Sequence, residues 1–303
     1  MRLPRKVIEE LVVAPGSPAG LSERSTSATT VHWFRDLGRR GAKDVLARDL
    51  EAYTAELAEA QNVLYASDRW AVLVILQGLD AAGKDGTIKH VLSGVNPQGC
   101  DVVSFKEPSE VELRHDFLWR AAAAVPARGM IGVFNRSHYE EVLVVRVHPE
   151  LLAAQRLPPG SPTGADLWRQ RYEDINAFEH HLARNGTRIV KFFLHLSKEE
   201  QRRRFLARID RPSKRWKLTR ADLHERDVFD AYRQAYEEAL TATSTPWAPW
   251  HVVPADHKPA MRALVAGVIV DTLDGLDLAY PSVDPAQMAF LDEARRKLEA
   301  EEG

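Results

Sequence analysis

The chain contains 303 residues, of which 45% are apolar and 28% are charged, as in ordinary globular proteins with a full hydrophobic core. A formal net charge of −2 excludes a general electrostatic attraction to nucleic acids or acidic membranes. The single cysteine, Cys100, excludes a framework of internal disulfides, and no apolar run approaches the length of a membrane span. We therefore expect a soluble cytoplasmic protein with no nucleic-acid or membrane partner.

Helical and strand patterns alternate along most of the chain. Residues 1–30, rich in Ser, Thr, Pro, Gly and Ala, predict an extended and partly mobile segment. Sequence patterns predict helices at 43–65, 84–92, 110–124, 142–147, 165–185, 224–243, 259–275 and 285–302, with one more after a capping box at 197–200. They predict strands at 72–76, 101–105, 130–134, 188–196 and 250–253.

This alternation predicts an α/β fold in which helices cover both faces of a parallel five-stranded sheet. We divide the chain into an N-terminal extension at 1–40, a core at 41–280 and a C-terminal helical tail at 281–303. Within the core, the polar and basic segment at about 208–225 is expected to form a lid.

The first strand runs into a phosphate-binding (Walker A) loop with the pattern GxxxxGK, followed by a helix. Small residues let successive backbone N–H groups surround an anion, and Lys84 supplies a positive charge for phosphoryl oxygens. The alternative is a glycine-rich turn with a solvated lysine. We expect phosphate contacts from Gly78, Ala81, Ala82, Gly83, Lys84, Asp85 and Gly86.

One position of this loop departs from the usual signature. Most phosphate-binding loops place Ser or Thr after the lysine, where its hydroxyl helps to hold Mg²⁺, but here the residue is Asp85. The loop also contains a carboxylate, Asp80, which is well placed to reach a metal ion. The sequence therefore predicts that Asp80 is a metal ligand.

A second motif, Asn135-Arg136, stands at the end of a strand expected beside the phosphate-loop strand, where ligands of open α/β sheets bind. Related enzymes place a metal-positioning acid at this point, whereas Asn135 is neutral. Glu140 or Glu141 could supply the missing charge, and the sequence does not distinguish between them. The alternative is a plain helix cap by Asn135, which leaves no role for Arg136 without an anion.

The third feature is a concentration of Lys and Arg between 201 and 220, which indicates a nearby polyanion. Arg202 and Arg203 taken singly are expected on a solvated helix face. The segment 210–217 has the composition of a loop instead, and we interpret it as part of the lid that closes over phosphates.

Two further segments are weaker signals. Lys106-Glu107-Pro108 resembles the Arg-Glu-Pro turn with which thymidylate kinases hold an acceptor nucleotide, and its alternative is an ordinary proline turn. Residues 254–258 stand where related kinases contact a base or sugar, although a helix-capping loop is the favoured interpretation. No His or Cys spacing indicates a zinc site.

The phosphate loop 78–86, the motif 134–141 and the basic segment 208–218 together resemble the second family of polyphosphate kinases, over about residues 40–280. The resemblance implies a thymidylate-kinase-like, three-layer α/β/α P-loop kinase core with a helical lid. It implies phosphoryl transfer between inorganic polyphosphate and AMP or ADP, making ADP or ATP, with Mg²⁺ or Mn²⁺ as cofactor. Direct in-line transfer without a phosphoenzyme is expected.

The resemblance also assigns roles to residues. Catalytic roles are implied for Asp80, Lys84, Asn135, Arg136 and Arg208. Polyphosphate contacts are implied for Lys214, Arg215 and Lys217, nucleotide contacts for Lys106, Glu107, Pro108, Asn135, Arg136 and Tyr139, and metal contacts for Asp80 with Glu140 or Glu141. Many members carry Asp at position 135, and the Asn form resembles a subgroup that accepts AMP as well as ADP. A homodimer or homotetramer is implied.

Two rival functions remain. An ATP-dependent nucleoside monophosphate kinase could use the same core, but a long polyanion requires more cationic residues than a triphosphate does. A nucleotide switch or nucleic-acid-binding protein is the second rival. The chain lacks an Asn-Lys-x-Asp guanine motif, and its basic cluster is a single lid-like segment.

Overall fold

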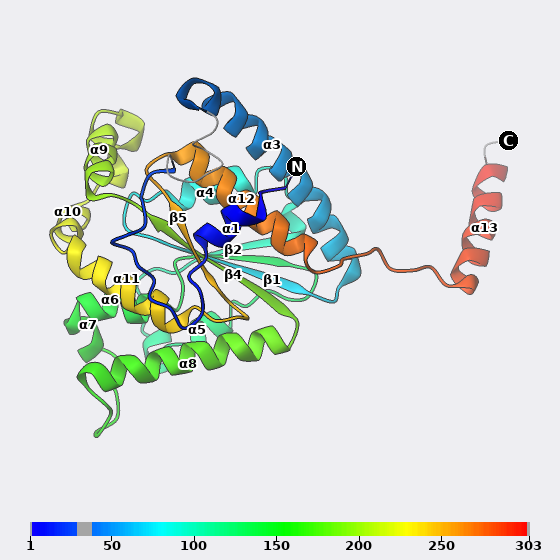
Figure 1. Ribbon diagram of the computed structural model, residues 1–303. Coiled ribbons are helices and arrows are strands. Elements are labelled where there is room, and N and C mark those ends of the chain that lie inside the picture. Colours follow the sequence, from blue (N-terminus) through cyan, green and yellow to red (C-terminus); the bar gives the residue numbers. More distant parts are fainter. Residues whose placement is uncertain (1, 29–37, 302–303) are drawn as a thin grey trace.

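The computed structural model describes residues 2–28 and 38–301 and confirms a parallel five-stranded sheet (Figure 1). The strands are β1 (Ala71–Gln77), β2 (Cys100–Ser104), β3 (Ile131–Asn135), β4 (Thr187–His195) and β5 (Trp250–Pro254). Their order is β2-β3-β1-β4-β5, and every neighbouring pair is parallel. The phosphate-loop strand β1 is therefore central, with β3 on one side and β4 on the other.

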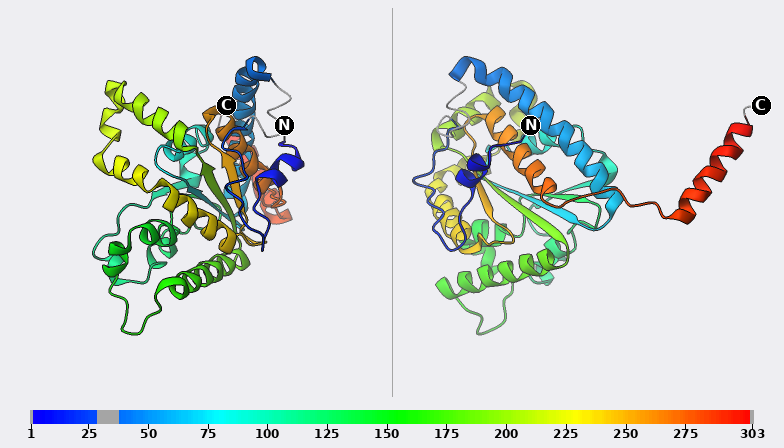
Figure 2. Two further views of the ribbon diagram at one scale, coloured as in Figure 1. Left: turned by 60° about the vertical axis from the view of Figure 1, so that its left-hand side comes forward. Right: turned by 45° about the vertical axis from the view of Figure 1, so that its right-hand side comes forward.

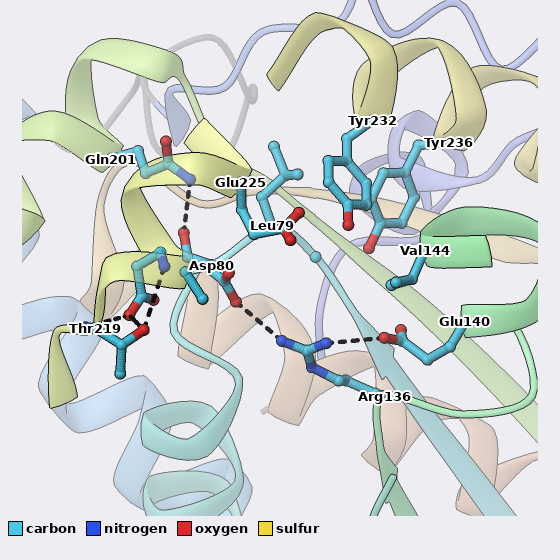
Figure 3. Close-up of a pocket in the computed structure, with 13 residues that line it drawn as sticks. Leu79, Asp80, Arg136, Glu140, Val144, Gln201, Thr219, Glu225, Tyr232 and Tyr236 are labelled. Atoms are coloured by element: carbon cyan, nitrogen blue, oxygen red, sulfur yellow. Dashed lines mark hydrogen bonds and ion pairs between the residues drawn. The ribbon is translucent and has the colours of Figure 1, made fainter. Parts of the chain in front are cut away.

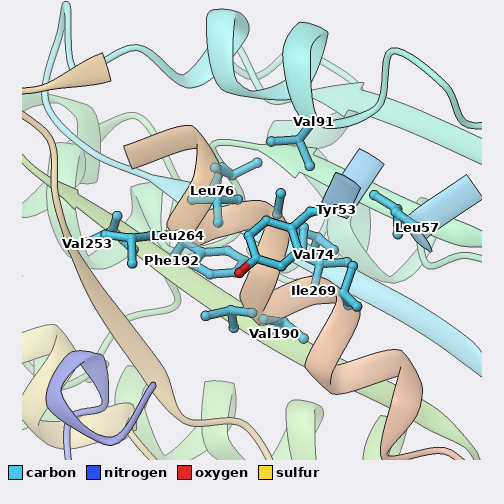
Figure 4. Close-up of a cluster of buried hydrophobic side chains, with 14 of the residues drawn as sticks. Tyr53, Leu57, Val74, Leu76, Val91, Val190, Phe192, Val253, Leu264 and Ile269 are labelled. Atoms are coloured by element: carbon cyan, nitrogen blue, oxygen red, sulfur yellow. The ribbon is translucent and has the colours of Figure 1, made fainter. Parts of the chain in front are cut away.

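Helices cover both faces of this sheet (Figures 1 and 2). One face carries α3 (Gly38–Ser67), α4 (Lys84–Val91) and α12 (Lys258–Asp274), and the other carries α6 (Glu140–Val147), α8 (Gly164–Arg184) and α11 (Phe229–Thr243). Successive side chains of a strand point to opposite faces. Val74 and Leu76 accordingly join the cluster against α3 and α12, shown in Figure 4, whereas Leu73 and Ile75 join the cluster on the other face.

The predicted helix at 110–124 is wrong. That stretch contains only the 3₁₀ helix η3 (Glu112–Arg114) and the short helix α5 (Trp119–Ala122). The side chain of Asp116 accepts a hydrogen bond of 2.9 Å from the N–H of Leu118, so it binds its own backbone in a turn and interrupts the helix. A second 3₁₀ helix, η2 (Pro97–Gly99), precedes β2, and α7 (Pro149–Ala153) lies in the connection before α8.

The lid region is more helical than its composition suggests. Helix α9 (Lys198–Ile209) leads into the 3₁₀ helix η4 (Pro212–Lys217) and then α10 (Arg220–Asp227). The predicted helix at 224–243 is thus two helices, α10 and α11, separated at Val228. Ser197 caps α9 by accepting a hydrogen bond from the N–H of Glu200, but the predicted capping box is incomplete, because the N–H of Ser197 donates to Asp256 Oδ1.

The N-terminal segment is not extended throughout, so that expectation is wrong. Helix α1 (Arg5–Leu11) buries Val7 and Leu11 in the core, and the N–H of Val13 donates a 2.8 Å hydrogen bond to Trp250 O of β5. Composition concealed the apolar spacing that drives this packing. Residues 29–37 lie outside the described residues, as does that part of the predicted extension.

The C-terminal helix α13 (Pro285–Ala300) stands apart from the body of the protein at the end of an extended segment (Figure 1). All of its described side chains are exposed or nearly so. Among residues 2–28 and 38–301, no helix has the length and apolar character needed to cross a bilayer.

Candidate active site

The phosphate loop joins β1 to α4, and two of its glycines are required by the local geometry. A Cβ on Gly78 would lie 3.1 Å from both Cβ and O of Leu194 in β4. Gly83 has a φ of +111° at the start of α4, and a Cβ there would lie 3.2 Å from Met261 Cε. Glycine at these positions lets the loop fold tightly against β4 and α12, which fixes the direction of its N–H groups.

Lys84 lies inside this loop. Its ammonium donates hydrogen bonds to Gly78 O at 2.5 Å and to Leu79 O at 3.4 Å. Burial lowers the pKa of Lys84 to about 8, and the charge of Arg136 acts in the same direction against the nearby carboxylates. The loop therefore holds the ammonium of Lys84 at the point where the sequence predicts a phosphate contact.

Arg136 bridges two carboxylates at the end of β3 (Figure 3). Its Nη2 lies 3.0 Å from Asp80 Oδ1, and its Nη1 lies 2.9 Å from Glu140 Oε2. Glu140 is the largest cause of the raised pKa of Arg136, and Asp80 adds to it against the opposing effect of burial. Arg136 has a φ of +62°, a strained conformation that often marks functional positions.

Asn135 and Asp85 form a second pair across the cleft. Asn135 Nδ2 donates a 2.9 Å hydrogen bond to Asp85 Oδ1, and Lys217 Nζ lies 3.5 Å from Asp85 Oδ2. Burial would raise the pKa of Asp85, but the Asn135 hydrogen bond and the lysine charges hold it below its ordinary value. The two departures from the usual signatures, Asp at 85 and Asn at 135, thus contact each other.

Two sequence-based site assignments are wrong. Glu141 points into the protein, where its carboxylate lies 3.1 Å from Nη1 of Arg171, so Glu140 is the glutamate beside Asp80. Tyr139 is fully buried, and its hydroxyl donates to Glu179 Oε1 at 2.8 Å, so direct nucleotide contact is excluded. Periodicity alone did not show which side of the first α6 turn faces the core.

A cavity of about 980 Å³ opens over the phosphate loop and extends beneath the lid. Eleven of its lining residues are Lys or Arg, whereas four are Asp or Glu. Of the lid residues for which polyphosphate contacts are predicted, Arg208, Lys214 and Lys217 line this cavity, together with Trp216, which is 74% exposed. Arg215 does not line this cavity, because its Nε donates to Ile209 O within the lid. Arg215 is therefore not in position to make the predicted contact with polyphosphate in this cavity.

Sequence analysis missed several basic residues of the cavity. Arg204 is 6% exposed and donates 2.8 Å hydrogen bonds to the carbonyls of Ala81 and Ala82 in the phosphate loop. Burial lowers its pKa to about 10. The sequence shows Arg204 in a row of three arginines, with no local signal that only this one points inward. The other missed residues are Arg203 and Arg211, and Lys258 and Arg262 of α12.

We call the cavity of about 980 Å³ over the phosphate loop the cationic cavity. A smaller compartment of about 300 Å³ adjoins it and shares Asp80 and Arg136 with it. Its far wall is formed by Tyr232 and Tyr236 of α11, with Glu140 of α6 beside them (Figure 3). Arg136 is the only Lys or Arg among its lining residues, and walls of aromatic rings and carboxylates suit a nucleoside better than a phosphate chain.

The three residues of the predicted acceptor-binding turn, 106–108, do not line one common cavity. Lys106 lines the cationic cavity, and its carbonyl accepts a 2.8 Å hydrogen bond from Arg120. Pro108 lines a separate small cavity beside Arg171, whereas Glu107 is exposed and lines neither. Of the three residues, only Lys106 is positioned to contact a ligand in the cationic cavity.

Within the described part of the chain, no group of three His, Cys, Asp or Glu side chains could hold a metal ion. The oxygen donors near the loop are the carboxylates of Asp80 and Asp85 and the amide of Asn135. Mg²⁺ in nucleotide sites is usually held by one or two carboxylates together with substrate phosphates and water. The donor set therefore fits a hard divalent cation that arrives with its phosphate ligand.

Known proteins match this chain in family, sequence and structure. The family model described as Polyphosphate kinase 2 matches residues 40–280. An ADP-polyphosphate phosphotransferase of Rhodopseudomonas palustris is 55% identical over 249 residues, covering 82% of this chain and 86% of the relative. An AMP/ADP-polyphosphate phosphotransferase of Meiothermus ruber is 46% identical over 246 residues, covering 81% and 88%.

A solved structure shows the same arrangement of elements. The crystal structure of polyphosphate kinase 2 from Arthrobacter aurescens TC1 superposes with a TM-score of 0.83 and 39% sequence identity. The superposition covers 97% of this chain and 99% of that one.

Proposed function

Because this chain belongs to the polyphosphate kinase 2 family, we propose that it transfers a phosphoryl group between inorganic polyphosphate and AMP or ADP. One observation carries the proposal. The phosphate loop opens at once to a cavity rich in Lys and Arg and to a smaller compartment walled by tyrosines and carboxylates. A polyanionic donor and a nucleotide acceptor fit these two spaces, with Arg136 at their junction.

The transfer needs positioning and charge neutralisation more than covalent chemistry. The loop N–H groups and Lys84 would hold the transferring phosphoryl group, and Arg136 would bind oxygens that gain charge in the transition state. Asp80 and Glu140 hold the Arg136 guanidinium from two sides, so it meets substrate already oriented. We expect direct in-line transfer and no phosphoenzyme.

Asp80 would hold a divalent cation, Mg²⁺ or Mn²⁺, together with substrate phosphates. Such an ion would neutralise negative charge on the phosphates when bound. Asp80 lines the cavity, and Arg136 binds its Oδ1, whereas Oδ2 accepts no hydrogen bond from the described side chains.

The nucleoside would occupy the compartment between α6 and α11, with Tyr232 and Tyr236 against the base or sugar. Lid residues Arg208, Lys214 and Lys217 would neutralise the polyphosphate. The family resemblance supports a homodimer or homotetramer, which light scattering in solution would test.

An ATP-dependent nucleoside monophosphate kinase is the rival function on this fold. The test is a donor–acceptor matrix in which polyphosphate or ATP is the only donor and AMP, ADP, GMP or GDP is the acceptor. We expect polyphosphate to phosphorylate AMP or ADP with far higher kcat/KM than ATP does. If ATP served as donor to AMP and polyphosphate did not, the rival function would replace the proposed one.

A further inference from the structure

Two basic residues at the start of α12 lack partners within the described chain. Lys258 and Arg262 lie one helical turn apart and both line the large cavity. Among the side chains described, those of residues 2–28 and 44–301, neither has an ion-pair or hydrogen-bond partner, and Arg262 Nε is buried without an acceptor. Lys258 is exposed to the cavity, so the observation that points to a ligand is the buried, unsatisfied Nε of Arg262, which indicates that an anion completes this wall.

Other cations surround this pair. Arg204, Arg208 and Lys214 all act on Lys258 electrostatically, and burial together with these charges lowers the pKa of Lys258 to about 8. Such a concentration of positive charge destabilises the empty cleft and attracts polyanions to it.

The sheet order places this pair on a definite side of the phosphate loop. Arg136 follows β3, whereas Lys258 follows β5, and the loop strand β1 lies between β3 and β4. Neighbouring strands are about 4.8 Å apart, so β5 lies roughly 10 Å from β1. Arg262 lies against the loop itself, since a Cβ on Gly86 would be 3.3 Å from Arg262 Nη2.

The geometry of in-line transfer predicts in which direction the donor chain extends from the phosphate loop. The attacking and leaving oxygens lie on opposite sides of the transferring phosphorus, so the departing chain extends away from the acceptor. The compartment assigned to the acceptor lies on the Arg136 side, with Glu140 and Tyr236. The departing polyphosphate should therefore extend toward β5 and α12.

We propose that Lys258 and Arg262 form a distal subsite that binds phosphates of the polyphosphate chain beyond the one transferred. The inference rests on the proposed function and deepens it. The subsite makes long chains bind more tightly than short ones, and it favours a phosphate chain over ATP as donor. An ATP molecule bound in the same direction would place its uncharged nucleoside among these cations, where it would leave them unpaired.

The test is binding of two inorganic probes, tripolyphosphate and a long-chain polyphosphate, measured by calorimetry at several salt concentrations. Tripolyphosphate is short enough to remain near Lys84. In the variant K258A/R262A, we expect the loss of affinity for the long chain to exceed the loss for tripolyphosphate about tenfold. Removing two phosphate contacts should also lower the salt dependence of long-chain binding by roughly one to two units of slope.

A charge-matched control is R295A/K297A on α13, which removes two cations from the helix that stands apart from the cleft. This control should leave the difference in affinity between tripolyphosphate and long-chain polyphosphate as in the wild type. The volume-preserving pair K258Q/R262Q repeats the measurement if the alanine variant unfolds at lower temperature.

Equal losses for both probes would overturn the inference, because the cations would then act as a general attraction. A larger rise in the KM of AMP than in the KM of polyphosphate would also overturn it, because the pair would then serve the nucleotide. These outcomes differ from failure of the proposed function, which would appear as wild-type protein that transfers nothing from polyphosphate.

Discussion

The Arg136 guanidinium lies 3.0 Å from the carboxylate of Asp80, although 56 residues separate them in the chain. This contact joins the phosphate loop to the end of β3, and Glu140 fixes the same guanidinium from its other side. The phosphate loop and the end of β3 are thereby held in one orientation relative to each other.

Replacing Arg136 by alanine should therefore remove most of the activity. We expect kcat to fall by about 10²–10³-fold, since the lost group binds charge that develops in the transition state. Steady-state kinetics with polyphosphate and AMP or ADP measures the effect. R169A is a matched control, because Arg169 also bridges two carboxylates but lies exposed on α8. Similar kinetics in both variants would contradict the assigned role.

The lowered pKa of Lys84 predicts a pH dependence. Its ammonium titrates at about 8, so positive charge in the loop is lost as the pH rises through that value. We expect kcat/KM for polyphosphate to decline above pH 8. K84R keeps its charge and should flatten the decline, whereas K258R tests whether Lys258, with a similar pKa, causes it instead. An unchanged profile in K84R would assign the decline to another group.

The Asn135–Asp85 pair predicts a charge conflict in N135D. Two carboxylates would then meet where the amide now donates a 2.9 Å hydrogen bond. One of them must protonate or bind a cation. We expect a loss of about 1–2 kcal/mol in unfolding free energy at neutral pH without divalent ions, partly restored by Mg²⁺.

The double variant N135D/D85N exchanges the two groups and tests the same contact. It should regain most of the lost stability, and the difference from the sum of the single variants measures the coupling. Urea unfolding of all four proteins provides the values. Strictly additive effects would show that the two side chains do not act on each other.

Arg204 should matter mainly for stability. Its removal leaves Oε1 of the buried Glu200 and the carbonyls of Ala81 and Ala82 without their donor, whereas Glu200 Oε2 keeps its contact with Arg203. We expect R204A to lose about 3 kcal/mol in unfolding free energy. The neighbouring R203A is the control, because Arg203 is largely exposed and its loss should cost under about 0.5 kcal/mol. Equal losses of unfolding free energy in R203A and R204A would contradict the structural role of Arg204.

The sequence predicts those parts of the protein that depend on local pattern. The β1 run and GxxxxGK define strand, loop and helix within a few residues, and alternation extends this to the whole sheet. The break at Asp116 was missed because a side chain bound its own backbone in a turn. The helical spacing at the N-terminus was overlooked because composition suggested a mobile segment.

Site residues on facing elements were harder to predict. Glu140 and Glu141 are adjacent in sequence, and only the packing of α6 against α8 assigns them to opposite environments. Arg204, Lys258 and Arg262 have no motif of their own, and they meet the loop only because β4 and β5 follow β1 in the sheet.

The packing of the N-terminal segment has a practical consequence. The family match begins at residue 40, yet Val13 pairs with β5, and Thr26 Oγ1 donates a 2.7 Å hydrogen bond to Asp256 just before α12. A chain trimmed to the family boundaries would expose an unpaired outer strand, which invites edge-to-edge association between molecules. Shortened versions made for crystallisation or catalysis should therefore keep these first residues.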